Sequence, residues 1–176
     1  MEQREAIELI RGGVTAPGGT WADLGAGSGT FTRALASLVG PDGVVYAVDR
    51  HTRSLAELAR AGGREGAAVR TLAADFTEPL ALPRLTGVVV ANALHYVPYE
   101  NQSRVLGEIA ALIDPPGAIV IVEYERREAN RRVPYPVTFE ALRGLATEAG
   151  LADPVRLASR PSRFSGSMYS ALVRRR

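Results

Sequence analysis

Short apolar runs alternate with amphipathic stretches along the first part of the chain. Five apolar runs indicate buried strands: 20–24, 44–48, 69–73, 87–91 and 118–122. Before and between them, apolar residues recur at helical spacing and predict helices over 3–11, 31–39, 52–61 and 105–113. Strand and helix in strict alternation over residues 1–125 predict a parallel sheet that is covered on both faces.

Residues 126–176 follow a different pattern. Thr138 is predicted to cap one more helix, which ends at Gly150. Two strands follow, Val155–Ala158 and Met168–Val173, joined by the turn-rich segment Arg160–Ser167. Strands this close in sequence, with no helix between them, must pair antiparallel. We therefore expect an α/β fold with a doubly wound sheet of about seven strands, mostly parallel, with a C-terminal antiparallel hairpin.

Composition narrows the chemistry. The 176 residues include no cysteine, and all 21 basic residues are arginine. This excludes a disulfide framework, a thiolate zinc site, a cysteine nucleophile and lysine Schiff-base chemistry, and we assign no metal ligand. The charged N-terminal segment lacks the apolar core of a signal peptide, and no apolar run approaches the length of a membrane span. The sequence therefore predicts a cytoplasmic protein without membrane partners.

A glycine loop with the sequence A-D-L-G-A-G-S-G joins the first strand to the next helix. Glycines at alternate positions allow a tight turn and close approach to a ligand, and the helix N-terminus offers unpaired N–H groups. A dinucleotide fingerprint needs G-x-G-x-x-G/A, whereas Thr30 stands at the third position after Gly27. The strand also ends in Asp23, an anion that disfavours a diphosphate and favours an ammonium group. Electrostatics therefore points to S-adenosyl-L-methionine, with S-adenosyl-L-homocysteine as product.

The loop Asp23–Gly29 resembles the first motif of class I S-adenosylmethionine-dependent methyltransferases. Other motifs of that family follow in order: Asp49 after the second strand, Asp75-Phe76 after the third, Asn92-Ala93-Leu94-His95 after the fourth, and Leu112-x-x-Pro115-x-Gly117 before the fifth. The resemblance covers nearly the whole chain and implies a three-layer, Rossmann-like fold. It implies one domain over 1–176, with a cofactor-binding half at 1–125 and a substrate-side segment and terminal hairpin at 126–176.

The resemblance also implies roles for the matching residues on the cofactor side. Asp23 would orient the methionine amine, and the backbone carbonyl of Asn92 would lie near it. Asp49 would hold the ribose, and Asp75 would accept a hydrogen bond from the adenine amino group. The loop residues under the methionine portion are Gly25, Ala26, Gly27 and Gly29.

Two cofactor-side residues keep a second interpretation. Phe76 either contacts the adenine ring or packs in the core. Arg50 either lies over the adenine face or is a solvated arginine at a strand end. Both are retained as candidate cofactor-binding residues.

Methyl transfer is an in-line displacement at the sulfonium methyl group, so it needs positioning and exclusion of water. A base is optional. His95 follows the fourth strand, at the carboxyl edge where α/β folds bind ligands, and can remove a proton from a phenol, hydroxyl or amine. The alternative is that His95 only shapes the pocket. Tyr96 is the second candidate catalytic residue, and the candidate substrate contacts are Tyr99, Glu123, Tyr124, Arg127 and Tyr135.

The acceptor is expected to be a small molecule. Enzymes that methylate amino groups of nucleic-acid bases resemble one another in a D/N-P-P-Y/F segment after the fourth strand, whereas this chain has N-A-L-H-Y. The segment 126–137 after the fifth strand is short, so the site is expected to be open. Either the substrate is bulky, or a homodimer or partner subunit closes the site, or the segment folds over as a flap.

The charges divide unevenly along the chain. Residues 1–125 contain 10 arginines and 15 acidic residues, whereas 126–176 contain 11 arginines and 4 acidic residues. The arginines after residue 125 either bind an anionic acceptor or a nucleic-acid backbone, or form a solvated loop. The competing functions are a nicotinamide-dependent oxidoreductase on a similar sheet, an RNA or protein methyltransferase, and a non-catalytic cofactor-binding subunit.

Overall fold

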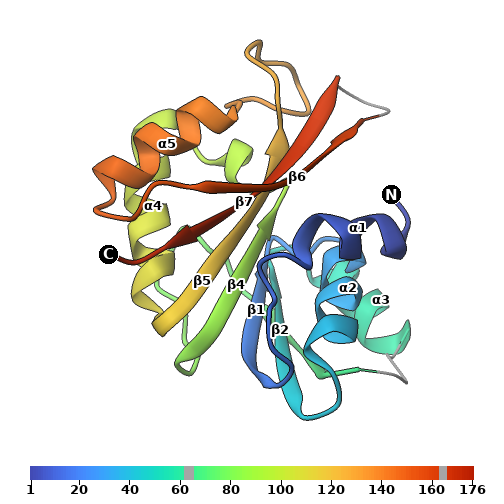
Figure 1. Ribbon diagram of the computed structural model, residues 1–176. Helices are drawn as coiled ribbons and strands as arrows, with labels where there is room; N and C mark the ends of the chain where they lie inside the picture. Colours follow the sequence, from blue (N-terminus) through green and yellow to red (C-terminus); the bar gives the residue numbers. More distant parts are fainter. Residues whose placement is uncertain (62–65, 163–165) are drawn as a thin grey trace.

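The computed structural model describes residues 1–61, 66–162 and 166–176 (Figure 1). The described strands form one sheet in the order β3-β2-β1-β4-β5-β7-β6. Its strands are β1 (Gly19–Leu24), β2 (Gly43–Asp49), β3 (Ala68–Ala73), β4 (Leu85–Ala91), β5 (Ile113–Tyr124), β6 (Val155–Pro161) and β7 (Ser167–Arg174). β1 to β5 pair parallel, and β7 pairs antiparallel with both β5 and β6. The predicted mostly parallel sheet with a C-terminal antiparallel hairpin is confirmed.

Helices cover both faces of the sheet. The helices are α1 (Gln3–Ile10), α2 (Thr30–Val39), α3 (Thr52–Ala61), α4 (Tyr99–Ala111) and α5 (Phe139–Glu148), with a short 3-10 helix at Leu94–Tyr96. α1, α2 and α3 lie on one face, and α4 and α5 lie on the other (Figure 1). Side chains alternate along the central strands, so Val89 packs under α1 and α2 whereas Val88 and Val90 pack under α4 and α5. This gives the three layers that the sequence predicted.

The strict alternation of strand and helix fails once. β3 ends at Ala73 and β4 begins at Leu85, and the segment between them is a loop without a helix. Pro79 and Pro83 disfavour a helix there, and the loop instead packs Leu80 against the core. This loop lies at the edge of the cleft described below.

Other boundaries shift by a few residues. α4 ends at Ala111, and Ile113 begins β5 instead of completing the helix. The motif with Pro115 and Gly117, placed before the fifth strand from the sequence, lies inside β5, where the pairing with β4 shifts register between Leu85 and Gly87. Thr138 caps α5 as predicted, because its hydroxyl oxygen accepts a hydrogen bond from the Ala141 amide. Residues 163–165 of the predicted turn lie outside the described residues.

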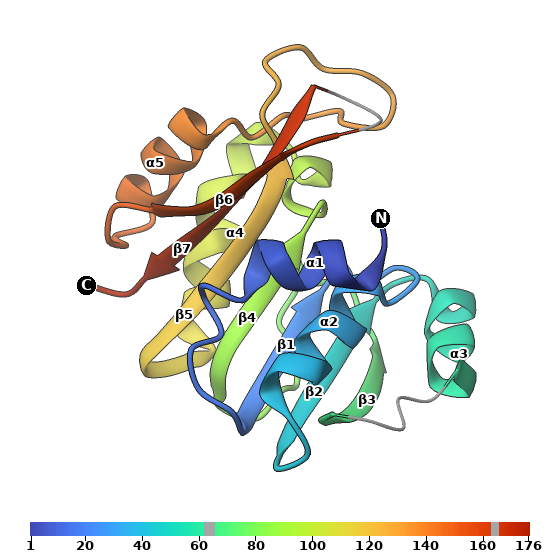
Figure 2. The same ribbon diagram turned by 45° about the vertical axis from the view of Figure 1, so that its right-hand side comes forward.

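The terminal hairpin lies against the first helix of the chain. α1 packs against β6 of the terminal hairpin, and Figure 2 shows α1 crossing the sheet below the hairpin. The order of the strands reverses between β1 and β4, where ligands of open α/β sheets bind at the carboxyl ends. No helix in the described part of the chain is long and apolar enough to cross a membrane.

Candidate functional site

The glycine loop turns sharply at the carboxyl end of β1. The amides of Gly25 and Ala26 both donate to the Val48 carbonyl, which holds the loop against β2. Gly25 has φ +78°, and a Cβ atom built there would lie 2.5 Å from the Cβ atom of Ala93. Only glycine satisfies both the left-handed backbone and this close approach. The loop therefore passes directly beside the segment that follows β4.

Asp23 is the buried acid at the base of this loop. One carboxylate oxygen, Oδ2, accepts a hydrogen bond of 2.6 Å from the Thr32 hydroxyl. The other, Oδ1, is buried and has no hydrogen-bond partner among the described residues. Burial raises the pKa of Asp23 from 3.8 to about 7, and the negative charge of Asp49 acts in the same direction. A buried acceptor without a partner at a ligand-binding edge fits a cationic donor such as an ammonium group.

Asp49 and Asp75 hold their places through backbone hydrogen bonds. Asp49 accepts from the amides of Gly27 and His51, each at 2.8 Å, so it fixes the glycine loop from the end of β2. Asp75 Oδ1 accepts from the Thr77 amide at 3.0 Å and the Thr77 hydroxyl at 2.8 Å. The Thr77 amide is the main cause of the lowered pKa of Asp75, which therefore stays ionised.

Three cavities meet along this edge, and Asn92 lines each of them. The α1-side cavity, of about 330 Å³, is lined by residues that include Glu5, Asp23, Gly25, Ala26, Gly27 and Arg160. The β3-side cavity, of about 540 Å³, includes Gly27, Asp49, Arg50, Asp75, Phe76 and Tyr96 in its lining. The loop-side cavity, of about 350 Å³, includes His95, Tyr96, Tyr124, Asn130 and Arg132.

Asn92 stands at the junction in an unusual conformation. Its φ is +52°, a left-handed value that asparagine adopts more readily than most residues. Its amide donates to the Val122 carbonyl at 2.8 Å, which ties the end of β4 to β5. Its side-chain Oδ1 is buried without a hydrogen-bond partner in the described chain. Asn92 thus offers a second acceptor at the point where the cavities join.

His95 forms a buried pair with Glu123. The imidazole Nδ1 lies 2.6 Å from Glu123 Oε2, and the His95 amide donates to Glu123 Oε1 at 3.1 Å. Both side chains are almost completely buried. The centroid of the His95 ring lies 4.4 Å from that of Tyr96 and 5.8 Å from that of Tyr124. A carboxylate on Nδ1 fixes the tautomer that leaves Nε2 as proton acceptor, the arrangement that a general base requires.

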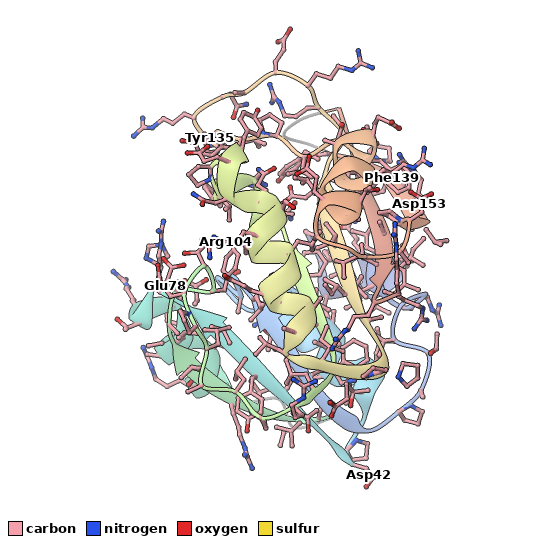
Figure 3. All side chains as sticks on the ribbon, turned by 90° about the vertical axis from the view of Figure 1, so that its left-hand side faces the viewer. Asp42, Glu78, Arg104, Tyr135, Phe139 and Asp153 are labelled. Carbon is pink, nitrogen blue, oxygen red and sulfur yellow. The ribbon has the colours of Figure 1, made fainter. Side chains whose placement is uncertain are left out.

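The segment 126–137 folds over this pair. The Tyr135 amide donates to the His95 carbonyl at 3.0 Å, and the Gln102 side chain donates to the carbonyls of Val97 and Tyr135. Figure 3 shows Tyr135 beside the first turn of α4, at the opposite end of the molecule from Asp42. These contacts hold the segment against the residues that follow β4.

The sequence also matches a family model. The model of the family described as "Methyltransferase domain" matches residues 22–117, more than half of the chain. The chain belongs to the methyltransferase domain family. The matched residues of this methyltransferase domain run from β1 into β5 and include the glycine loop, Asp49, Asp75 and the segment after β4. No curated protein sequence matches the chain significantly.

Solved methyltransferase structures share the fold of this domain. Magnesium protoporphyrin IX methyltransferase of Synechocystis PCC 6803, with bound SAM, has a TM-score of 0.70 at 19% identity over 98% of this chain and 79% of its own. The 1,6-didemethyltoxoflavin-N1-methyltransferase of Burkholderia thailandensis, with its substrate and S-adenosylhomocysteine, has a TM-score of 0.75 at 24% identity over 99% and 78%. N-methyltransferase NodS of Bradyrhizobium japonicum WM9, in complex with S-adenosylhomocysteine, has a TM-score of 0.77 at 18% identity over 98% and 86%.

The structure gathers most of the residues proposed from the sequence. Every candidate cofactor-binding residue except Gly29 lines the α1-side or the β3-side cavity. Gly29 instead faces α3, where a Cβ atom would lie 2.4 Å from Leu58 Cδ1. Its glycine allows α2 and α3 to approach each other, which is a packing role. Tyr96, the second candidate catalytic residue, and Tyr124, a candidate substrate contact, both line the loop-side cavity.

Glu123 and three other candidate substrate contacts lie differently from expectation. Glu123 faces His95 and is fully buried, because successive side chains of β5 point to opposite faces and Tyr124 takes the cavity side. Arg127 is exposed, and Tyr99 and Tyr135 pack edge to face with centroids 5.3 Å apart. None of these three lines the loop-side cavity.

The cavity linings also include residues that the motifs did not single out. Asn130 and Arg132 lie in the loop-side cavity, and Glu5 and Arg160 lie in the α1-side cavity. The arginine-rich composition of the segment 126–137 was a weak signal for Arg132. Nothing in the sequence linked Glu5 to Arg160, since their meeting depends on how α1 packs against β6.

Proposed function

We propose that this chain is an S-adenosylmethionine-dependent methyltransferase that methylates a small-molecule acceptor. The observation that carries the proposal is the Asp23 carboxylate oxygen beside the glycine loop, which has no hydrogen-bond partner among the described residues. It lies at a cavity that meets the cavity of His95 at Asn92. An acid is suited to an ammonium group and unsuited to a diphosphate, which favours this cofactor over a dinucleotide.

The residues of the cleft fit the parts of the cofactor. Asp23 would hold the methionine amine, Asp49 the ribose, and Asp75 the adenine amino group, with Phe76 against the ring. When bound, the cofactor would supply an activated methyl group on its sulfonium. An acceptor lone pair in line with the S–CH3 bond would form the new bond to the methyl carbon as that bond breaks, with S-adenosylhomocysteine as the leaving group. Residues 1–125 would serve the cofactor, and residues 126–176 would close the acceptor side.

The loop-side cavity supports an acceptor that loses a proton. His95 would take that proton on Nε2, and Glu123 would stabilise the imidazolium ion through Nδ1. Tyr96 and Tyr124 would hold an aromatic or planar acceptor, and Arg132 gives the cavity a cation. These features favour a phenol or hydroxyl group on a small molecule, with an anionic group on the acceptor tolerated.

Methyl transfer from labelled S-adenosylmethionine into a metabolite extract tests the activity directly. We expect labelled product from an acceptor of this class. With that acceptor, Glu123→Gln and His95→Gln should each lower kcat by about 10²- to 10⁴-fold, the range of general-base catalysis, while S-adenosylhomocysteine affinity changes little.

Glu108→Gln, an exposed glutamate on α4, is the matched control and should keep the full rate. A full rate in His95→Gln would reduce His95 to a wall of the cavity. No labelled product from any acceptor would favour a non-catalytic cofactor-binding subunit.

A further inference from the structure

Arg160 extends from the end of β6 to α1 and forms an ion pair with Glu5, 155 positions away in the sequence. The pair uses the guanidinium Nη2, and both side chains are 28% exposed. The other terminal nitrogen, Nη1, is buried and has no hydrogen-bond partner among the residues that the structure describes. Both Arg160 and Glu5 line the α1-side cavity.

A buried guanidinium nitrogen without an acceptor is unfavourable, because it has lost its hydrogen bonds to water and forms no other hydrogen bond in their place. Arginine has five N–H donors in a fork, so one guanidinium can bind two carboxylates at once. Glu5 supplies the first carboxylate, and the pKa of Glu5 is lowered to about 2 chiefly by its hydrogen bond from Arg160. The geometry leaves Nη1 available for a second.

The same cavity also holds the unpartnered oxygen of Asp23. A cavity of about 330 Å³ thus presents one buried donor on a cation and one buried acceptor on an acid, both without partners in the described chain. The first residues of α2, Thr30 and Phe31, also line it, and a helix N-terminus favours an anion. An α-amino acid group in its zwitterionic form matches this pattern, with the ammonium toward Asp23 and the carboxylate toward Arg160.

We propose that Arg160 binds the α-carboxylate of the methionine portion of the cofactor and that Glu5 positions its guanidinium. This rests on the proposed function. It gives the terminal hairpin a part in cofactor binding, whereas the sequence placed cofactor binding in residues 1–125 alone. α1 and the hairpin, which lie next to each other in Figure 2, would then both line the methionine end of the cleft.

Calorimetric titration with two nucleosides tests the assignment. S-Adenosylhomocysteine carries the carboxylate, and its decarboxylated analogue keeps the amine and lacks only that group. The unsubstituted protein should bind S-adenosylhomocysteine at least about tenfold more tightly than the analogue. Arg160→Gln should weaken S-adenosylhomocysteine binding by a similar factor, leave the Kd of the analogue unchanged, and so abolish the preference.

Two further variants separate binding from folding. Arg160→Lys keeps the charge and should recover part of the preference, with circular dichroism checking the fold of both variants. Arg104→Gln, on α4 at the opposite face of the sheet (Figure 3), removes another paired arginine and should bind both ligands normally.

Equal weakening of both nucleosides in Arg160→Gln would overturn the assignment, because that pattern belongs to a structural role. Unchanged binding of both would also overturn it. A raised KM for a carboxylate-bearing acceptor with unchanged S-adenosylhomocysteine affinity would assign Arg160 to the acceptor instead. Absence of S-adenosylhomocysteine binding by the unsubstituted protein would overturn the proposed function, and the assignment with it.

Discussion

Burial determines the pKa of the Asp23 carboxyl group. An isolated aspartate is ionised at neutral pH, but this side chain is 1% exposed and shares its surroundings with Asp49. Burial penalises the charged form, so the pKa rises to about 7. The family motif predicted that Asp23 would orient the methionine amine. It did not predict the hydrogen bond from Thr32 or the unpartnered oxygen, because these depend on how α2 packs over β1.

Asp23→Asn should change how stability depends on pH. The unfolded pKa is near 3.8 and the folded pKa near 7, so the folded state keeps a proton that the unfolded state loses between these values. Asp23 therefore lowers stability as pH rises from 4 to 7, by up to roughly 4 kcal/mol, and adds no further change above that. Urea denaturation at a series of pH values should show that, between pH 4 and 7, the free energy of unfolding of the asparagine variant rises relative to that of the unsubstituted protein.

The control for this experiment is Asp42→Asn, on an exposed turn at the far end of the molecule (Figure 3). Its stability should follow the unsubstituted protein at every pH. A constant offset between Asp23→Asn and the unsubstituted protein, from pH 4 to pH 8, would contradict the raised pKa.

At the scale of elements, the glycine loop combines two kinds of glycine. Gly29, at the N-terminus of α2, has φ +79° and leaves room for Leu58 of α3. Gly27 has φ +51°, but a Cβ atom there would meet nothing closer than the Gly25 carbonyl oxygen at 4.0 Å. The alternating spacing in the sequence treats them alike. Only the position of α3 shows that one serves packing and the other faces the cleft.

Alanine should therefore mainly lower stability at Gly29 and mainly weaken cofactor binding at Gly27. Gly29→Ala should lower the free energy of unfolding by about 2–4 kcal/mol, because it adds a clash with Leu58 to the backbone strain. Gly27→Ala should lower it by only about 1–2 kcal/mol, from the strain alone, while reducing S-adenosylhomocysteine affinity more than Gly29→Ala does. Urea denaturation and calorimetry measure the two effects, and equal losses of stability would contradict the distinction.

Secondary structure followed the hydrophobic pattern wherever burial was periodic. The segment between β3 and β4 has no helical spacing, and it forms a loop in which Pro79 and Pro83 disfavour a helix, so the alternation of strand and helix is not strict there. The boundary between α4 and β5 also moved, because Ile113 continues the helical spacing but pairs with Leu85 of β4. Apolar spacing alone cannot tell the last residue of a helix from the first of a strand.

At the scale of the whole molecule, the acidic first part of the chain and the basic last part contact each other. The acidic helix α1 lies against β6, where Arg160 meets Glu5. The acidic first part and the basic last part therefore share one wall of the cleft. We expect a cofactor bound at this wall to stabilise the whole fold, because it joins segments from both ends of the chain.

A thermal-shift titration tests this and separates the two cofactor classes. S-Adenosylhomocysteine at about 100 times its Kd should stabilise the folded state by about 2.7 kcal/mol, which raises Tm by roughly 5–10 °C for a domain of this size. NADH and NADPH should leave Tm unchanged. Stabilisation by a nicotinamide nucleotide without any shift from S-adenosylhomocysteine would favour the oxidoreductase alternative.

The sequence by itself determined the sheet, its helical cover and the residues that follow each parallel strand, because burial periodicity and local motifs act over short stretches of chain. The tertiary structure decided which distant residues meet. Glu123 pairs with His95 because β4 and β5 are neighbours and the pleat turns that carboxylate inward. Arg160 reaches Glu5 because α1 packs against the terminal hairpin. Such pairings depend on how elements pack, which leaves no local trace in the chain.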